Sequence, residues 1–236
     1  TVPSWLTCNA GALTGTPTNS DVGSHAVVIT ATDNSGATAA DSFTIVVSNA
    51  NDAPTVSSTA ITTATEDAVY TYTLTGADAD VGDTLTMSGT TVPSWLTFTA
   101  STGVLTGTPT NDNVGTTGNA VVLTITDAAG ESVTDSFTIT VANTNDAPSF
   151  SSSPVLTAQE DDVYTYTAVG TDMDAGDTFT LGSSSVPSWL TFTASTGVLT
   201  GTPTNSDVGG HSVTLTVTDA AGAVSYTHLR AHETAY

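Results

Sequence analysis

The chain has 236 residues, of which 23 are acidic and only Arg230 is Lys or Arg, so its formal net charge is −22 at pH 7. This charge argues against binding to nucleic acid or anionic lipid and favours cations as partners, although dense acid also keeps secreted proteins soluble. The sequence contains no apolar run that could span a bilayer, no initiator Met and no signal peptide. We therefore expect an internal fragment without direct membrane insertion.

The sequence is a tandem repeat, and the repeat has to be settled before single residues are interpreted. The motif Asn-x-Asn-Asp-Ala-Pro occupies residues 49–54 and recurs 94 positions later, at 143–148. Residues 92–111 and 186–205 are identical, which indicates a recent duplication. The repeat predicts the C-terminal half of a module at 1–52, a complete module at 53–146, a module lacking its last strand at 147–223, and a non-native tail at 224–236.

Alternation of polar and apolar residues predicts strands with one buried face, for example at 69–74 and 121–126. Gly, Pro and Asp turns interrupt these runs at short intervals. In the complete module we predict strands near 55–63, 68–75, 84–90, 95–99, 103–106, 119–126 and 133–142. About seven short strands indicate an all-β fold of tandem antiparallel β-sandwich modules.

A recurring Pro-Ser-Trp-Leu run is expected to supply the core. We predict that Trp95, Leu96 and Phe98 are core residues, because an exposed Trp in every module would be a surface liability. The alternative is that Trp5, Trp95 and Trp189 form a platform on which sugars stack.

The only cysteine, Cys8, aligns with Phe98 and Phe192. It is therefore predicted to be a small buried hydrophobe rather than a nucleophile or a metal ligand. A single cysteine allows no disulfide framework, so another stabiliser, such as a metal, could matter outside the cell.

The third module stops following the repeat after Ala223. Its expected last strand is replaced by residues 224–234, which resemble a translated sequencing-library adaptor and include Arg230. We therefore exclude this segment from functional interpretation. A genuine basic tail is the alternative.

Acidic residues recur at fixed places in each module. Glu-Asp precedes the second strand, Asp-x-Asp follows it, one Asp lies in the last hairpin turn, and Asn-x-Asn-Asp forms the junction. Such oxygens, meeting across a junction, are the hard ligands that Ca²⁺ requires. Asp127 and Asp219 could equally be turn formers, whereas the crowding of Asp78, Asp80 and Asp83 favours ligation because uncompensated carboxylates repel one another.

These motifs, with Val-Pro-Ser-Trp-Leu-Thr-Phe and Thr-Gly-Val-Leu-Thr-Gly-Thr-Pro, resemble bacterial cadherin-like repeats of the dystroglycan-type or Ig-like kind, over residues 1–223. The resemblance implies Ca²⁺ ligands at both junctions. Where cadherins carry Asp-Arg-Glu, this chain has Thr-Asn-Ser-Asp-Val-Gly, which supplies Asp21 and Asp207 but Asn113 in the second module. The later junction would use Glu66, Asn143, Asn145, Asp146, Asp172, Asp174 and Asp219. The earlier junction would use Asn49, Asn51, Asp52, Asp78, Asp80 and Asp127.

The resemblance implies a Ca²⁺-stiffened repeat segment of an extracellular or cell-surface bacterial adhesin or stalk. Its partners would be neighbouring repeats of the same chain and an adhesive protein or surface glycan. We expect no enzyme, because the paired carboxylates recur in every module and no nucleophile elbow or phosphate loop is present. The alternatives are a carbohydrate-binding accessory module of a polysaccharide-degrading enzyme and a metal-free spacer.

Overall fold

The structure is a computed structural model that describes residues 1–115 and 117–233, with side chains described through residue 227. The chain forms two compact units. Unit 1 comprises Thr1–Ala64, Ala68–Thr108 and Thr116–Thr140, and unit 2 comprises Thr65–Asp67, Pro109–Gly115 and Val141–Tyr236. We keep the names first, second and third module for residues 1–52, 53–146 and 147–223, and we describe β23, which follows residue 223, together with the third module. Among the described residues, no helix has the length and apolar character needed to cross a membrane.

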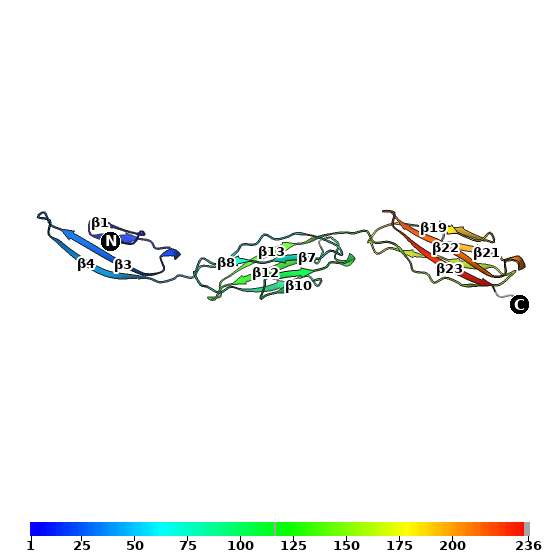
Figure 1. Cartoon of the computed structure of the whole chain (residues 1–236), viewed down its shortest axis with the longest axis horizontal. Helices are drawn as coiled ribbons and strands as arrows, with labels where there is room; N and C mark the ends of the chain where they lie inside the picture. Colours follow the sequence, from blue (N-terminus) through cyan, green and yellow to red (C-terminus); the bar gives the residue numbers. More distant parts are fainter. Residues whose placement is uncertain (116, 234–236) are drawn as a thin grey trace. The chain divides into compact units, whose positions relative to one another are not determined.

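The first module consists of two hairpins and a short 3₁₀ turn (Figure 1). Strand β1 pairs with β2, and β3 pairs with β4, both antiparallel. The bounds are β1 Leu6–Asn9, β2 Ala12–Gly15, η1 Asn19–Asp21, β3 Gly23–Thr32 and β4 Thr38–Val47.

The second module is a sandwich of two three-stranded sheets, in the orders β10-β11-β7 and β13-β12-β9, with the short ladders β14-β6 and β5-β8. The predicted all-β fold is confirmed. The bounds are β5 Thr55–Val56, β6 Thr63–Thr65, β7 Tyr70–Thr73, β8 Gly76–Ala77, β9 Thr86–Thr91, β10 Leu96–Thr99, β11 Val104–Gly107, η2 Asn111–Asn113, β12 Ala120–Thr126, β13 Ser132–Thr138 and β14 Thr140–Ala142.

The third module repeats this arrangement with the sheets β17-β21-β20 and β16-β23-β22-β19 and the ladder β15-β18. Its bounds are β15 Ser149–Phe150, β16 Thr157–Ala158, β17 Tyr164–Thr167, β18 Gly170–Thr171, β19 Phe179–Ser185, β20 Leu190–Thr193, β21 Val198–Gly201, η3 Asn205–Asp207, β22 Gly210–Asp219 and β23 Val224–Glu233.

The structure differs from the prediction that this module has no last strand. Strand β23 pairs antiparallel with β22 along its length and parallel with β16 at its end. Ladder hydrogen bonds are made by the backbone, so an alternating segment such as Val224-Ser225-Tyr226-Thr227 can occupy an open sheet edge whatever its origin. The resemblance of residues 224–234 to an adaptor stays a prediction, and residues 234–236 lie outside the described residues.

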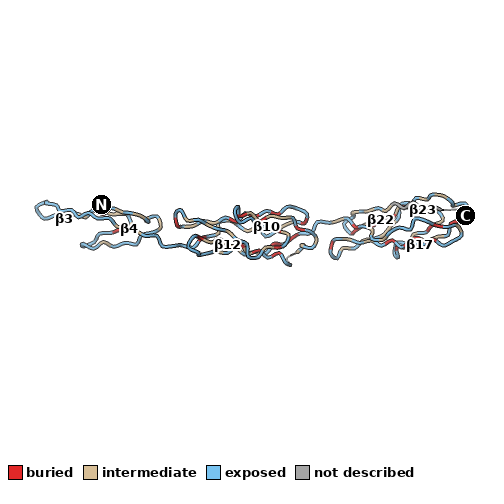
Figure 2. Tube along the Cα trace, turned by 90° about the horizontal axis from the view of Figure 1, so that it is seen from below, coloured by how far each residue is buried: buried red, intermediate tan, exposed pale blue. Residues whose placement is uncertain are grey.

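The core lies between the two sheets of each sandwich. Leu105, Leu123 and Ile125 are fully buried in the second module, and Leu199 and Leu215 are fully buried in the third. Figure 2 shows buried residues (red) in the second and third modules, whereas β3 and β4 of the first are mostly exposed (pale blue). The alternating pattern of β12 thus yields one buried face, as its sequence predicts.

The Pro-Ser-Trp-Leu run supplies the core only in part. Leu96 is buried, while Trp95 and Phe98 are half-buried. Trp95 lies edge-on to Tyr70, with ring centroids 5.8 Å apart, and its Nε1 donates a hydrogen bond to Asn119 Oδ1 at 2.9 Å. The indole of Trp95 therefore packs within its own module, which argues against a role in a sugar-stacking platform. The prediction for Cys8 is wrong, because the thiol is exposed in the open hairpin of the first module.

We expect His211→Asn to stabilise the third module. Trp189 Nε1 is buried without a hydrogen-bond partner, and the indole lies edge-on to His211, which occupies the place of Asn119. An asparagine at position 211 can accept a hydrogen bond from the indole N–H. The substitution removes the hydrogen bond between the His211 ring and the Asp207 carbonyl. Relieving a buried unsatisfied donor outweighs one ordinary hydrogen bond, for a net gain of about 1 kcal/mol. Thermal unfolding checks this, and the converse Asn119→His is expected to lower the stability of the second module.

Candidate functional site

The linker that follows β14 is fixed by side chains of unit 2. The Asp146 backbone N–H donates to Asp174 Oδ2 at 2.8 Å, and Asn143 Nδ2 donates to Asp174 Oδ1 at 2.9 Å. Asn145 Nδ2 donates to Asp219 Oδ2 at 2.8 Å. Asp174 and Asp219 are both buried. The linker therefore supplies donors to carboxylates that desolvation would otherwise penalise.

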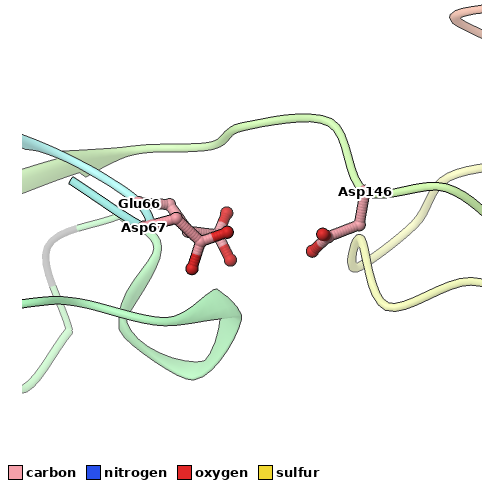
Figure 3. Close-up of side chains that lie close together, drawn as sticks. All are labelled: Glu66, Asp67 and Asp146. Carbon is pink, nitrogen blue, oxygen red and sulfur yellow. The ribbon is translucent and has the colours of Figure 1, made fainter.

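A second set of contacts comes from the turn before β7. Glu66 is 2% exposed, and its Oε2 accepts the Thr144 backbone N–H at 3.1 Å. Carboxylate oxygens of Glu66, Asp67 and Asp146 lie within 4.8 Å of one another, and Figure 3 shows Asp146 pointing toward the other two. Asn111 Nδ2 from η2 donates to Asp146 Oδ2 at 2.6 Å. We call Glu66, Asp67 and Asp146 the Glu66 cluster.

A third group, also in unit 2, consists of carboxylates of the third module. Oxygens of Asp172, Asp177 and Asp219 lie within 4.8 Å of one another, and we call them the Asp172 cluster. Asp219 Oδ1 accepts the backbone N–H groups of Gly222 and Ala223, as an Asp turn former does. The hydrogen bond from Asn145 is the main cause that holds the pKa of Asp219 below its usual value. Asp219 is therefore a turn former through Oδ1, whereas its role as a Ca²⁺ ligand stays a prediction.

The junction after β4 repeats this arrangement within unit 1. Asp52 N–H donates to Asp80 Oδ2 at 2.8 Å, and Asn51 Nδ2 donates to Asp127 Oδ2 at 2.9 Å. The bond from Asn51 is the main cause that lowers the pKa of Asp127. Oxygens of Asp78, Asp83 and Asp127 cluster within 4.8 Å of one another. Asn49 lines a groove beside Asp80 and Asp83.

Several of these oxygens are buried without a hydrogen-bond donor. They are Asp78 Oδ2, Asp80 Oδ1 and Asp172 Oδ2. A buried carboxylate oxygen that lacks a donor is costly unless a cation lies against it. The donor set is carboxylate and carbonyl oxygen, which suits Ca²⁺ or Mg²⁺ better than a metal that prefers sulfur or nitrogen. The residues present therefore fit a hard divalent cation.

The structure brings the sequence-predicted residues together in two carboxylate clusters at the later linker and, among the described residues, in one at the earlier linker. Glu66 and Asp146 lie in one cluster, while Asp172 and Asp219 lie in the other. Sequence reasoning did not place Asp67, Asp177 and Asn111 at the later junction, or Asn19 at the earlier one, where Asn19 Nδ2 donates to Asp52 Oδ2 at 2.6 Å. The available signal was recurrence, because the asparagine of the 3₁₀ turn appears in every module as Asn19, Asn111 and Asn205.

The residues that stand in place of the cadherin Asp-Arg-Glu segment are turn caps. Asp207 Oδ2 accepts the Thr204 backbone N–H at 2.9 Å and its hydroxyl at 2.8 Å. Asn113 Oδ1 makes the equivalent bonds to Thr110 at 2.9 and 3.2 Å. This cap sets the conformation of the turn, and the turn in η2 presents Asn111 to the linker.

We expect Asp207→Asn to keep this cap and to remove its acid sensitivity. The Thr204 backbone N–H is the main cause that lowers the pKa of Asp207 below 3.8. The ionised carboxylate thus stabilises the native turn above the unfolded-state pKa, and this contribution is lost as pH falls through the lowered native pKa. Thermal unfolding is measured from neutral pH down to about pH 3. The wild type and the variant should have the same melting temperature at neutral pH, and the melting temperature of the variant should fall less in acid. An acid loss equal to that of the wild type would contradict the assignment.

Comparison with known proteins gives a family match and a fold match. The family model described as "Putative Ig domain" matches residues 1–48, 53–142 and 147–230. The "Serine-rich adhesin for platelets" of Staphylococcus aureus is 33% identical over 155 residues, which are 63% of this chain and 6% of that protein. The chain therefore spans a small part of the curated relatives that it matches, with a share of 10% in strain MRSA252.

Solved cadherin structures share the fold. The first four extracellular repeats of protocadherin γB3 cover 97% of this chain and 63% of their own, with a TM-score of 0.62 and 16% identity. Repeats 22–24 of mouse cadherin-23 cover 98% of this chain and 83% of their own, with a TM-score of 0.54 and 16% identity. An endo-fucoidan hydrolase of glycoside hydrolase family 107 is 26% identical, but its TM-score of 0.38 supports no inference.

Proposed function

We propose that this chain, which belongs to the Putative Ig domain family, binds Ca²⁺ at its linkers. We further propose that it is part of an extracellular or cell-surface bacterial adhesin or stalk. The observation that carries the proposal is the pair of carboxylate clusters beside the linker at 143–146. In each cluster three carboxylates approach within 4.8 Å of one another. Such crowding of negative charge is unfavourable without a cation.

The ligand sets follow from the two clusters. In unit 2, Glu66, Asp67 and Asp146 would hold one ion, and Asp172, Asp177 and Asp219 a second. In unit 1, Asp78, Asp83 and Asp127 would hold the corresponding ion. The linker asparagines and the buried carboxylates Asp80 and Asp174 orient these groups through the hydrogen bonds described above. Bound Ca²⁺ supplies the positive charge that the clusters lack and takes oxygen ligands in flexible geometry.

Binding would couple to the order of the linker. An ion that needs oxygens from Glu66 and Asp146 together binds only when the linker holds its folded path. Ca²⁺ would therefore shift each linker from a flexible to an ordered state, to the extent that it prefers the ordered one. The repeat segment would then act as a spacer that is stiff in calcium-containing fluids.

An adhesive role is supported by the relatives. The matching S. aureus protein is described as an adhesin for platelets, and its 33% identity over 155 residues favours a related role for this chain as a non-catalytic segment. The ligand could be a protein or a surface glycan. The carbohydrate-binding alternative gains no support from the tryptophans, because Trp95 and Trp189 are engaged with Tyr70 and Tyr164 inside their modules.

Thermal unfolding and small-angle scattering with Ca²⁺ or a chelator test the proposal. For dissociation constants of about 10⁻⁴ to 10⁻³ M, about 10 mM Ca²⁺ should stabilise each site by about 1.4 to 2.7 kcal/mol. Ca²⁺ should raise the melting temperature, and it should increase the maximum particle dimension derived from scattering. No change in either quantity would support the metal-free spacer, and Ca²⁺-independent binding of soluble glycans would support the carbohydrate-binding module.

A further inference from the structure

The third module contains an open apolar pocket that is lined by residues of both of its sheets. Its volume is about 540 Å³, which is within the range of pockets that hold small ligands. The lining consists of residues 167–170, which run from β17 into β18, residues 179–181 of β19, and residues 194–197 of the turn between β20 and β21. None of these residues is charged, although the chain carries 23 acidic residues. The pocket therefore suits a neutral, apolar group.

A change at one core position opens this pocket. Ala168 stands where the second module has Leu74, 94 positions earlier in the chain. Both side chains face the core, since Leu74 is 1% exposed and Ala168 is 3% exposed. Alanine lacks the isopropyl group that leucine places in the second module. The atoms around that place therefore lose their packing partner in the third module.

The backbone does not close the space that this change leaves. The Leu74 N–H donates to the Gly103 carbonyl at 2.8 Å, and the Ala168 N–H donates to the Gly197 carbonyl at the same distance of 2.8 Å. A Cβ at Gly103 would meet the Leu74 carbonyl oxygen, and a Cβ at Gly197 would meet the Ala168 carbonyl oxygen. The strand and the turn thus approach each other equally in the two modules, and the space of the missing group remains.

The larger aromatic residue in the third module does not fill the space either. The ring of Phe179 lies against Gly170, where a Cβ would be 2.7 Å from Cε2. In the second module a Cβ at the equivalent Gly76 would meet Ile125 Cδ1 at 2.6 Å. The counterpart of Ile125 is Val217, which has no such methyl group. The ring therefore replaces this methyl group and forms a wall of the pocket.

The mouth of the pocket combines apolar surface with hydroxyl groups. Val169 is 49% exposed there and stands where the second module has Thr75. The exposed hydroxyl residues among the lining are Thr167, Thr180, Ser195 and Thr196. An apolar floor with a few polar groups around it is the usual composition of a ligand site. The hydroxyl groups can form hydrogen bonds with the polar end of a ligand.

We propose that this pocket binds a branched aliphatic group of the size of a leucine side chain, carried by a peptide or by a small neutral molecule. Leu74 shows the fit, because its side chain is buried at the equivalent place in the second module. A group that enters the pocket of the third module would regain these contacts and remove apolar surface from water. The pocket shares no residue with the carboxylate clusters, so failure of this proposal is separate from failure of the proposed function.

Methyl NMR of the full chain tests the proposal. The probes are N-acetyl-leucinamide and isoamyl alcohol, which carry the same branched group with and without amides. Both should shift the methyl signals of Val169 and Leu181, with dissociation constants on the order of 1 mM. The control N-acetyl-alaninamide lacks the branched group and should bind at least about tenfold more weakly. Tighter binding of N-acetyl-leucinamide than of the alcohol would identify a peptide as the source, and equal binding would identify a small neutral molecule.

Ala168→Leu is the matched variant, because it restores the side chain of the second module. It should abolish the methyl shifts without lowering the melting temperature, since it fills existing space. The control Ala120→Leu adds the same atoms at an exposed position of the second module and should keep binding. The proposal is overturned by an absence of shifts at Val169 and Leu181, by equal binding of N-acetyl-alaninamide, or by Ala168→Leu that still binds or melts at a lower temperature.

Discussion

In the variant Asp172→Asn with Asp174→Asn, the rise in melting temperature that Ca²⁺ produces in unit 2 is expected to be smaller by the contribution of the ion in the Asp172 cluster, while the third module stays folded. Asp172 belongs to the Asp172 cluster, and Asp174 orients the linker through bonds to Asn143 and to the Asp146 backbone. The expected loss is the full ion contribution, about 1.4 to 2.7 kcal/mol for a site near saturation. Differential scanning calorimetry with Ca²⁺ and with chelator measures it.

The control for this variant is Asp41→Asn with Asp162→Asn. It changes the net charge by the same amount, and both residues are exposed outside the two clusters. The control should keep the Ca²⁺ response. If the control also loses it, general charge neutralisation rather than ligation explains the effect, and if the double variant unfolds the third module, the two acids are structural.

Gly201→Ala is expected to destabilise the third module by about 3 kcal/mol or more. A Cβ at Gly201 would lie 1.9 Å from the Trp189 carbonyl oxygen and 3.1 Å from Leu190 Cα. Both are backbone atoms, one in β20 and one in the residue before it, so no rotation of a side chain can relieve the contact. Thermal and denaturant unfolding should show the loss.

Gly182→Ala in the same module is the matched control. Its Cβ would meet the Thr216 hydroxyl at 2.7 Å, which is the end of a side chain that can rotate. The expected change is below about 1 kcal/mol. A similar loss in both variants would mean that chain entropy rather than the backbone contact decides the effect of Gly201.

The sequence predicted the strands well because alternation has a direct physical cause. The apolar positions of β12 point to one side, and that side must be buried. It also identified Asp78, Asp80, Asp127 and their repeats, because Asp-x-Asp and a hairpin Asp recur at fixed places. These signals are local, so they can be recognised in the sequence without knowing which loops lie close together in the fold.

The remaining site residues could not be predicted because they depend on how loops fold. Asn111 reaches Asp146 only through the capped η2 turn. Asp67 enters its cluster with a φ of 60°, a left-handed conformation that Asp tolerates better than most residues. The open face that exposes Cys8 was also missed, because alignment with Phe98 and Phe192 assumes that the covering strands are present.

The shared register of the repeated hairpins has a consequence for how the chain folds. Strands β10 and β11 are identical in sequence to β20 and β21, and both pairs accept a Tyr-Thr-Tyr-Thr strand in the same alignment. The pairing register alone therefore does not distinguish a hairpin's own tyrosine strand from that of the neighbouring module. Proximity along the chain is what favours the correct partner, so the order in which modules emerge and close protects the array from misassembly.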